Sequence, residues 1–153
     1  MKQTLKRGLT ALTLSAVLAS GHVLAENLRI GAVAPKTGPL AGGATVTQGP
    51  TIKLWAEQVN AKGGINVQGE MMPVEIIEYD DQTNPGETIK AVQRLATQDK
   101  ADFIIAPYGT GLNIAAAPIF ARYGYLQIAV SAITDQVEDL SGKFPGMFFT
   151  LGS

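Results

Sequence analysis

The sequence contains no cysteine, and its single histidine, His22, lies near the N-terminus. Disulfides, cysteine nucleophiles and Cys/His sites for structural zinc are therefore excluded. A Ser-His-Asp triad is excluded too once the N-terminal segment is removed. Neither GxGxxG nor the phosphate-binding pattern GxxxxGK[ST] occurs, so nucleotide binding has no support. We expect no metal and no cofactor.

The sequence also lacks an apolar run long enough to span a bilayer, which needs roughly 20 residues. Residues 1–25 instead have the organisation of a secretory signal peptide. Three basic residues precede an apolar run from Leu9 to Ala19, and the small residues Val23 and Ala25 suit signal peptidase. The alternative is a membrane anchor. We expect a cleaved leader, a mature chain that begins at Glu26 and a periplasmic location.

Positive charge is scarce in the remaining 128 residues. Without the leader the chain keeps nine basic and thirteen acidic residues, so its formal charge is −4. Nucleic acid is not expected as a partner, because phosphate binding needs clustered Lys and Arg. The length suits one domain with a core of its own and leaves no room for a second of similar size.

Short β-rich runs alternate with helical patterns after Glu26. This alternation is typical of βαβ units and of an α/β fold with a parallel sheet covered on both faces. We expect strands at Leu28–Ala34, Val74–Tyr79, Asp102–Ala106, Leu126–Val130 and Met147–Leu151.

Three helices have recognisable ends. The first begins near Pro50, carries an apolar stripe that includes Trp55, and stops at Gly63. The second begins at Asn84, which can cap free N–H groups while Glu87 returns the bond.

The third helix covers about residues 111–123, with Thr110 as the expected cap and Gly124 as the expected end. Pro118 lies in its interior. We expect a kink or a local break there.

Several motifs together resemble a known family. They are Asn60–Ile65 (NAKGGI), Val74–Pro85 (VEIIEYDDQTNP), Ile30–Val33 (IGAV) and Thr37–Gly43 (TGPLAGG). In their order and spacing these segments are similar to the first lobe of type I periplasmic binding proteins of the leucine/isoleucine/valine-binding family. The resemblance covers Asn27 to the last residue.

The resemblance implies an open parallel sheet with strand order 2-1-3-4, as in flavodoxin-like folds. It implies a periplasmic solute-binding component of an ABC importer for branched-chain or related amino acids or small organic carboxylates, and not an enzyme. The partners would be a small-molecule ligand and a permease in the inner membrane. Residues 26–153 would form an N-terminal lobe that stops at the first hinge crossing, so we expect a fragment that binds weakly and exposes apolar surface.

In an open parallel sheet, ligands bind beyond the carboxyl ends of the strands, where the strand order reverses. With the implied order, three loops converge there: residues 35–44, 107–111 and 131–134. All three are rich in small or hydroxylated residues, which let backbone groups approach a solute.

Thr110 and its neighbours Tyr108 and Gly109 are the first candidate ligand-binding residues. A helix that starts at Thr110 would present free N–H groups and a favourable dipole to an anion. The resemblance implies that this residue grips the α-carboxylate of the ligand, while the alternative is that Thr110 only caps the helix. Tyr108 would stack on the ligand or close the pocket edge, or simply pack at a strand end.

The remaining candidates are Ser131, Ala132 and Thr134, in a segment that the resemblance links to the ammonium group of the ligand. Ile133 stands where relatives have a threonine hydroxyl, and isoleucine accepts no hydrogen bond. Either Thr134 shifts into place or the ligand lacks an α-amino group. Relatives often place an aromatic residue where this chain has Gly42 and Gly43, so the pocket is expected to be roomier on that side.

Two other function classes stay open. Asp80 and Asp81 could serve as an acid–base pair or hold magnesium, although the family resemblance implies a structural role in a strand-to-helix turn. The same fold also occurs as the extracellular sensor domain of receptors. A transmembrane helix in the residues beyond the chain would indicate a receptor.

Overall fold

A parallel sheet organises residues 27–151, the part of the chain that the computed structural model describes. Strand β1 (Leu28–Ala34) is central and pairs with β4 (Val74–Asp80) on one side and β5 (Phe103–Ile105) on the other. Both pairings are parallel, and Ile30 lies opposite Ile76 and Phe103. The α/β class and the 2-1-3 part of the expected order are confirmed. The leader predicted at residues 1–25 lies outside the described residues.

The last two strands continue the sheet in a different way. Strand β6 (Gln127–Ala129) lies beside β5 but forms its ladder with β7 (Met147–Phe149), in parallel. Within residues 27–151 no ladder joins β5 to β6. Strand β6, which was predicted to be fourth, thus lies beside β5 as expected. Its hydrogen bonds are made with β7, the strand predicted to be fifth. Strands β5, β6 and β7 have three residues each and are shorter than expected.

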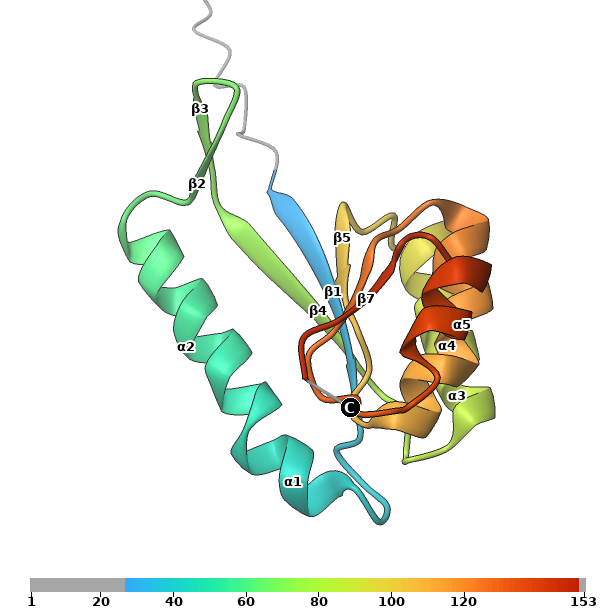
Figure 1. Ribbon diagram of the computed structural model, residues 1–153. Coiled ribbons are helices and arrows are strands. Elements are labelled where there is room, and N and C mark those ends of the chain that lie inside the picture. The colour runs from blue at the N-terminus through green and yellow to red at the C-terminus, as the bar shows by residue number, and fades with distance from the viewer. Residues whose placement is uncertain (1–26, 152–153) are drawn as a thin grey trace, which may run out of the picture.

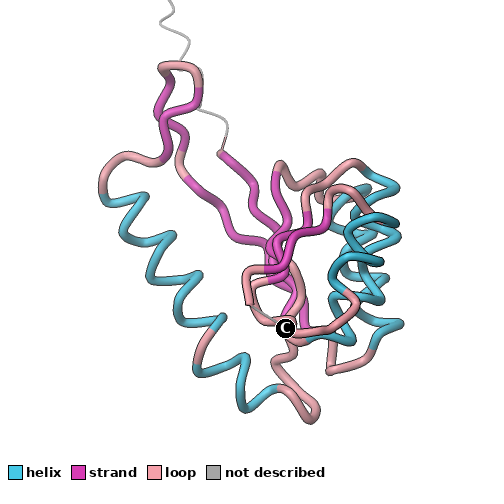
Figure 2. Tube along the Cα trace, in the orientation of Figure 1, coloured by secondary structure: helices cyan, strands magenta, loops and turns pink. Residues whose placement is uncertain are grey.

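Helices lie on both sides of the sheet (Figures 1 and 2). Helix α2, with α1 at its N-terminal end, lies on one side, and α3, α4 and α5 cover the other. A short helix, α1, follows β1, and a hairpin of β2 and β3 follows α2. The bounds are α1 Ala41–Val46, α2 Gln48–Ala61, α3 Pro85–Thr97, α4 Thr110–Tyr123, α5 Val137–Lys143, β2 Ile65–Val67 and β3 Glu70–Met72. The pattern did not predict α1, α5 or the hairpin.

The start of α3 confirms the expected cap. The Asn84 side chain accepts hydrogen bonds from the N–H groups of Gly86 (2.8 Å) and Glu87 (3.2 Å). The expected return bond from Glu87 was wrong. The Asn84 N–H donates to the Asp81 carbonyl instead, and the Glu87 carboxylate accepts from the Lys90 ammonium.

Helix α4 differs from expectation at two points. Its N-cap is Gly109, whose φ of 93° and ψ of 152° suit glycine, so Thr110 is the first helical residue and not the cap. The helix also runs without a break through Pro118. This side chain is exposed, so water can satisfy the carbonyl that proline leaves without a partner. Gly124 ends the helix in the left-handed conformation, as predicted.

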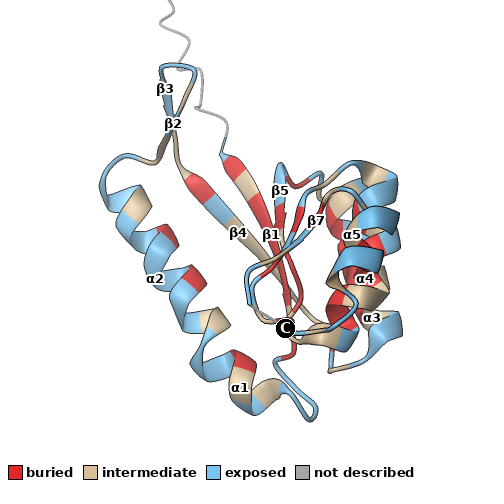
Figure 3. Ribbon diagram, viewed as in Figure 1, coloured by how far each residue is buried: buried red, intermediate tan, exposed pale blue. Residues whose placement is uncertain are grey.

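The main core lies between the sheet and helices α3 and α4 (Figure 3). It contains fully buried side chains from β1, α3 and α4, namely Val33, Val92, Leu95, Ala116 and Phe120. A smaller cluster on the other side joins β1, β4 and α2, through Leu28, Ile30, Val74 and Ala56. Among the described residues no helix is long and apolar enough to cross a membrane.

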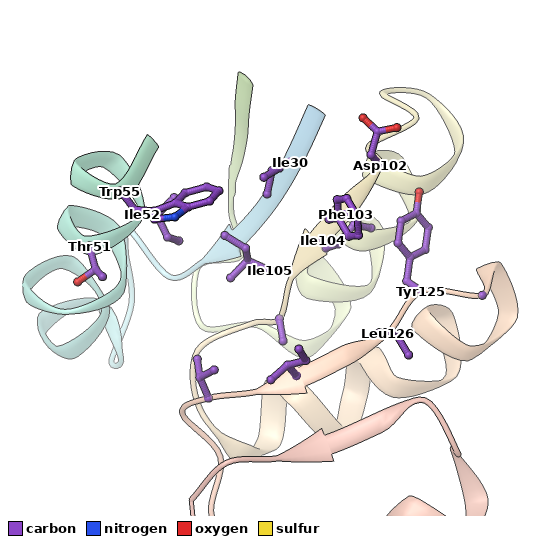
Figure 4. Close-up of a pocket in the computed structure, with 14 residues that line it drawn as sticks. Ile30, Thr51, Ile52, Trp55, Asp102, Phe103, Ile104, Ile105, Tyr125 and Leu126 are labelled. Atoms are coloured by element: carbon purple, nitrogen blue, oxygen red, sulfur yellow. The ribbon is translucent and has the colours of Figure 1, made fainter. Parts of the chain in front are cut away.

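The α2 side of β5, β6 and β7 is not covered. Phe103 is 60% exposed and Ile128 is 50% exposed, and Phe148 is exposed on the neighbouring strand. A hollow of 680 Å³ lies between this surface and α2 (Figure 4). Trp55 lines it and is 38% exposed. Its expected place in the core was therefore wrong for the described residues, because nothing in them fills the space beside α2.

Candidate functional site

The loops at the carboxyl ends of β1, β5 and β6 meet as the strand order predicts. The Gly109 N–H donates to the Ser131 hydroxyl at 3.0 Å. The Thr110 hydroxyl donates to the Ile133 carbonyl and accepts from the Ile133 N–H, both at 3.0 Å. The structure thus brings the predicted residues Gly109, Thr110 and Ser131 together.

The start of α4 leaves backbone donors open at this meeting point. The Asn113 N–H is bonded to the Gly109 carbonyl at 3.1 Å. Within residues 27–151, the N–H groups of Thr110, Gly111 and Leu112 have no protein acceptor. Three free donors and the positive end of a 14-residue helix suit an anion such as a carboxylate. The Thr110 hydroxyl, in contrast, already has two bonds to the neighbouring loop.

Ala132 and Thr134, the other predicted residues of the third loop, have structural contacts of their own. The Ala132 side chain is fully buried in a cluster with Leu140 and Met147, so its methyl group cannot reach a ligand. The Thr134 hydroxyl accepts from the Gln136 N–H at 3.2 Å and supports the turn into α5. Only backbone groups of Ala132 and the remaining bonding capacity of Thr134 are available to a ligand.

Tyr108 crosses from the second loop to the first, where its phenol lies against Gly43. Its side chain is half-buried. The expectation of a roomier pocket beside Gly43 was therefore wrong, because the phenol fills the space that a side chain at position 43 would take. Beside Gly42 the space is open, since nothing lies within 4 Å of a Cβ built there.

Two buried polar residues that the sequence reasoning missed support the second loop. The Asn113 side-chain amide donates to the carbonyls of Pro107 (2.6 Å) and Gly109 (2.9 Å). The Gln127 amide in turn donates to the backbone and side-chain oxygens of Asn113, at 2.8 and 3.1 Å. Both residues are fully buried. A polar residue within the apolar stretches Leu112–Ile114 and Leu126–Ile128 is the signal that could have identified them.

Asp80 holds the first loop in place. Its carboxylate accepts from the N–H groups of Lys36 (2.9 Å), Thr37 (3.3 Å) and Gln82 (2.8 Å), and from the Thr37 hydroxyl (2.8 Å). Burial by itself would raise the pKa of Asp80. The hydrogen bonds outweigh burial and lower this pKa below its usual value.

Asp81 is fully buried and less well satisfied. One carboxylate oxygen accepts from the Thr83 N–H at 2.9 Å, while the other has no hydrogen-bond partner in the described residues. Burial raises the pKa of Asp81 against the lowering effects of the Thr83 bond and the Thr88 hydroxyl, and the neighbouring Asp80 charge adds to the rise. Residues 27–151 contain no group of three His, Cys, Asp or Glu side chains that could hold a metal ion. The contacts of both aspartates support their structural interpretation.

Residues 27–153 match the family model described as "Periplasmic binding protein". The chain belongs to this family. The match includes every loop and helix of the candidate site.

Individual members of the periplasmic binding protein family are also similar. An amino acid binding protein of Pseudomonas aeruginosa is 32% identical over 147 residues, which are 94% of this chain and 37% of that protein. Leu/Ile/Val-binding protein homolog 1 of Brucella abortus is 32% identical over 137 residues, which are 89% of this chain and 34% of that protein.

Solved structures of ABC transporter substrate-binding proteins share the fold. LivJ of Streptococcus pneumoniae, in complex with isoleucine, aligns with a TM-score of 0.73 and 25% identity over 84% of this chain and 34% of that chain. A solute-binding protein of Rhodopseudomonas palustris, in complex with 3,4-dihydroxybenzoic acid, aligns with a TM-score of 0.67 and 26% identity over 83% and 32%. The chain spans about one third of the length of these relatives.

Proposed function

We propose that this chain is the N-terminal lobe of a periplasmic solute-binding protein that serves an ABC importer. The observation that carries the proposal is the meeting of three loops around the free N–H groups of Thr110, Gly111 and Leu112, in a chain of the periplasmic binding protein family. A helix start beyond the carboxyl end of a strand, at the point where strand order reverses, is a favourable place for an anionic ligand.

The proposed ligand is a small molecule with a carboxylate group, either an amino acid or another small organic acid. The two solved relatives that support this class contain isoleucine and 3,4-dihydroxybenzoic acid. These two ligands share a carboxylate group and differ in the rest of the molecule. Free N–H donors at the start of α4 fit the group that they share.

Each candidate residue has a proposed role. The N–H groups of Thr110 and Gly111 bind the carboxylate, and the Thr110 and Ser131 hydroxyls hold the second and third loops together. Gly109 provides the turn, Tyr108 forms a wall, and the backbone of Ala132 and the hydroxyl of Thr134 face the ligand. The lobe binds its ligand without chemical change, so no catalytic residue is assigned.

In this proposal residues 1–25 direct export to the periplasm, and residues 26–153 are one of two lobes. The second lobe would close over the ligand, and the inner-membrane permease would recognise the closed form. Binding by the first lobe alone is weak, because the ligand keeps one side open to water.

Binding of L-isoleucine and of 3,4-dihydroxybenzoate to the whole chain, measured by saturation-transfer NMR, tests the proposal. We expect at least one of them to bind with a millimolar Kd. Thr110→Val removes both bonds to Ile133 and separates the loops, so it should weaken binding about tenfold or more.

Thr97→Val is the matched control. The Thr97 hydroxyl donates to the Gln93 carbonyl near the end of α3 and takes no part in the three loops. Binding should therefore stay unchanged in this variant. If the wild-type chain binds neither compound, the proposed function is overturned.

A further inference from the structure

The phenol of Tyr108 occupies the space that a side chain at position 43 would need. A Cβ built on Gly43 would lie 2.5 Å from the Tyr108 hydroxyl oxygen and 3.1 Å from Cζ. Real Cβ atoms essentially never approach other heavy atoms below 3.0 Å. Position 43 therefore admits only glycine while the phenol stays where it is.

A second contact joins the same two loops. A Cβ built on Gly109 would lie 3.0 Å from the Leu40 Cδ1 atom, and the φ of Gly109 is +93°, a value that favours glycine. Leu40 precedes α1 and Gly109 precedes α4. The first and second loops thus close against each other at two points, and at each point a glycine faces a side chain of the other loop.

Tyr108 stands next to the start of α4, where the proposed function places the carboxylate of the ligand. It immediately precedes Gly109, the cap of that helix, and its side chain stays half-exposed. Within residues 27–151 its hydroxyl has no hydrogen-bond partner. A flat ring with a free hydroxyl offers an apolar face for stacking and a polar group at its edge.

Four acceptors around the site already take a hydrogen bond from within the protein. The carbonyls of Pro107 and Gly109 accept from the Asn113 amide, and the Ile133 carbonyl accepts from the Thr110 hydroxyl. The Ser131 hydroxyl accepts from the Gly109 N–H. Three backbone donors at the start of α4 are free for a carboxylate, while each of these four acceptors already holds a hydrogen bond.

We propose that the Gly43–Tyr108 pair determines ligand selection at this site. Gly43 leaves the space in which the phenol lies, and the phenol ring favours carboxylates with a flat apolar body over α-amino acids. This inference rests on the proposed function, because it assumes that the start of α4 holds the carboxylate.

The adjacent glycines of α1 provide a matched pair of variants. Gly43→Ala displaces the Tyr108 ring, which can move because its hydroxyl is the free end of a side chain. Gly42→Ala adds the same methyl group to the same helix and meets nothing within 4 Å. The gain in helix propensity is similar in both variants, so a difference between them reports on Tyr108.

The experiment is a titration of the whole ¹⁵N-labelled chain with 3,4-dihydroxybenzoate and with L-isoleucine, followed through the backbone amides of residues 108–112. We expect the wild type and Gly42→Ala to bind the benzoate more tightly than the amino acid. Gly43→Ala should bind the benzoate about threefold to tenfold more weakly, as expected for a lost aromatic contact, with little change for L-isoleucine.

Tyr108→Ala should lose the same preference, and the double variant Gly43→Ala/Tyr108→Ala should lose no more than either single variant. Tighter binding of L-isoleucine by the wild type, or equal effects at positions 42 and 43, would overturn the inference and leave the proposed function standing. No amide shift with either compound would overturn both.

Discussion

Both faces of the sheet carry apolar side chains, but the two faces differ in how well they are covered. On the α3–α4 face Phe120 is 1% exposed, and Leu95 and Ile104 are buried. On the α2 face Phe103 and Ile128 are at least half exposed, although α2 buries the neighbouring part of β1 and β4. On this face the boundary between covered and open surface runs along β5, where Ile105 packs against the α2-side cluster and Phe103 is exposed.

Strand β5 shows what the difference means. Phe103 and Ile104 are consecutive residues and point to opposite faces of the sheet, one open and one buried. Consecutive apolar residues are typical of parallel strands that are buried on both faces. The sequence of β5 thus suits a strand that is packed on both faces, and the described residues pack fully against only one of them. Large exposed apolar surfaces usually mark a site that binds protein, membrane or ligand, or a tendency to aggregate.

The difference in cover can be tested by removing a phenylalanine ring from each face of the sheet. Phe120→Ala creates a cavity between α4 and the sheet and should cost about 3–5 kcal/mol of unfolding free energy. Phe103→Ala removes a ring that is mostly in water and should change the unfolding free energy by about 0.5 kcal/mol or less. Urea unfolding followed by circular dichroism measures both. Equal losses would show that the α2 face is covered in solution.

A second test adds charge to the open face. We expect the whole chain to self-associate through Phe103, Ile128 and Phe148, and the double variant Phe103→Lys/Ile128→Lys to shift toward monomer. Gln93→Lys adds a charge to the exposed surface of α3 and serves as the control, with association unchanged. Sedimentation velocity over a range of concentrations measures the shift. A monomeric wild-type chain at all concentrations would contradict the expectation.

Local signals predicted the elements on which the fold depends most. The limits of β1 and the Asn84 cap of α3 follow from short stretches of sequence, because strand alternation and capping are local. Helix α1 was not predictable in this way. Gly42 and Gly43 give it low helix propensity, and it is held by the buried Ala44 and by the Thr47 hydroxyl, which donates to the Gly43 carbonyl.

The candidate site was predictable in position and not in detail. The rule for open parallel sheets placed Thr110 and Ser131 at the same edge, where the structure has them. The bonds between Thr110 and Ile133 join residues 23 positions apart, and no local pattern specifies them. The fit of Tyr108 against Gly43 is likewise a tertiary contact, visible only once the loops have met.

Asp80 and Asp81 should give a small pH dependence of stability, because hydrogen bonds compensate the burial of Asp80 better than that of Asp81. The pKa of Asp80 is lowered, so its ionised form favours folding; this contribution is present above about pH 4 and is lost as pH falls through the lowered pKa. The pKa of Asp81 is raised, so its protonated form favours folding; this contribution is present below about pH 4 and is lost as pH rises through the raised pKa.

The difference in Tm between the wild type and Asp80→Asn and the difference between the wild type and Asp81→Asn should therefore change in opposite directions between about pH 3 and pH 7. The wild type should gain Tm relative to Asp80→Asn as pH rises, because the clamp on Lys36 and Thr37 is strongest when Asp80 is ionised. It should lose Tm relative to Asp81→Asn over the same range, because one oxygen of the Asp81 carboxylate has no partner among residues 27–151. A wild-type gain over both variants as pH rises would show that hydrogen bonding controls both carboxyl groups, and a loss relative to both would show that burial does.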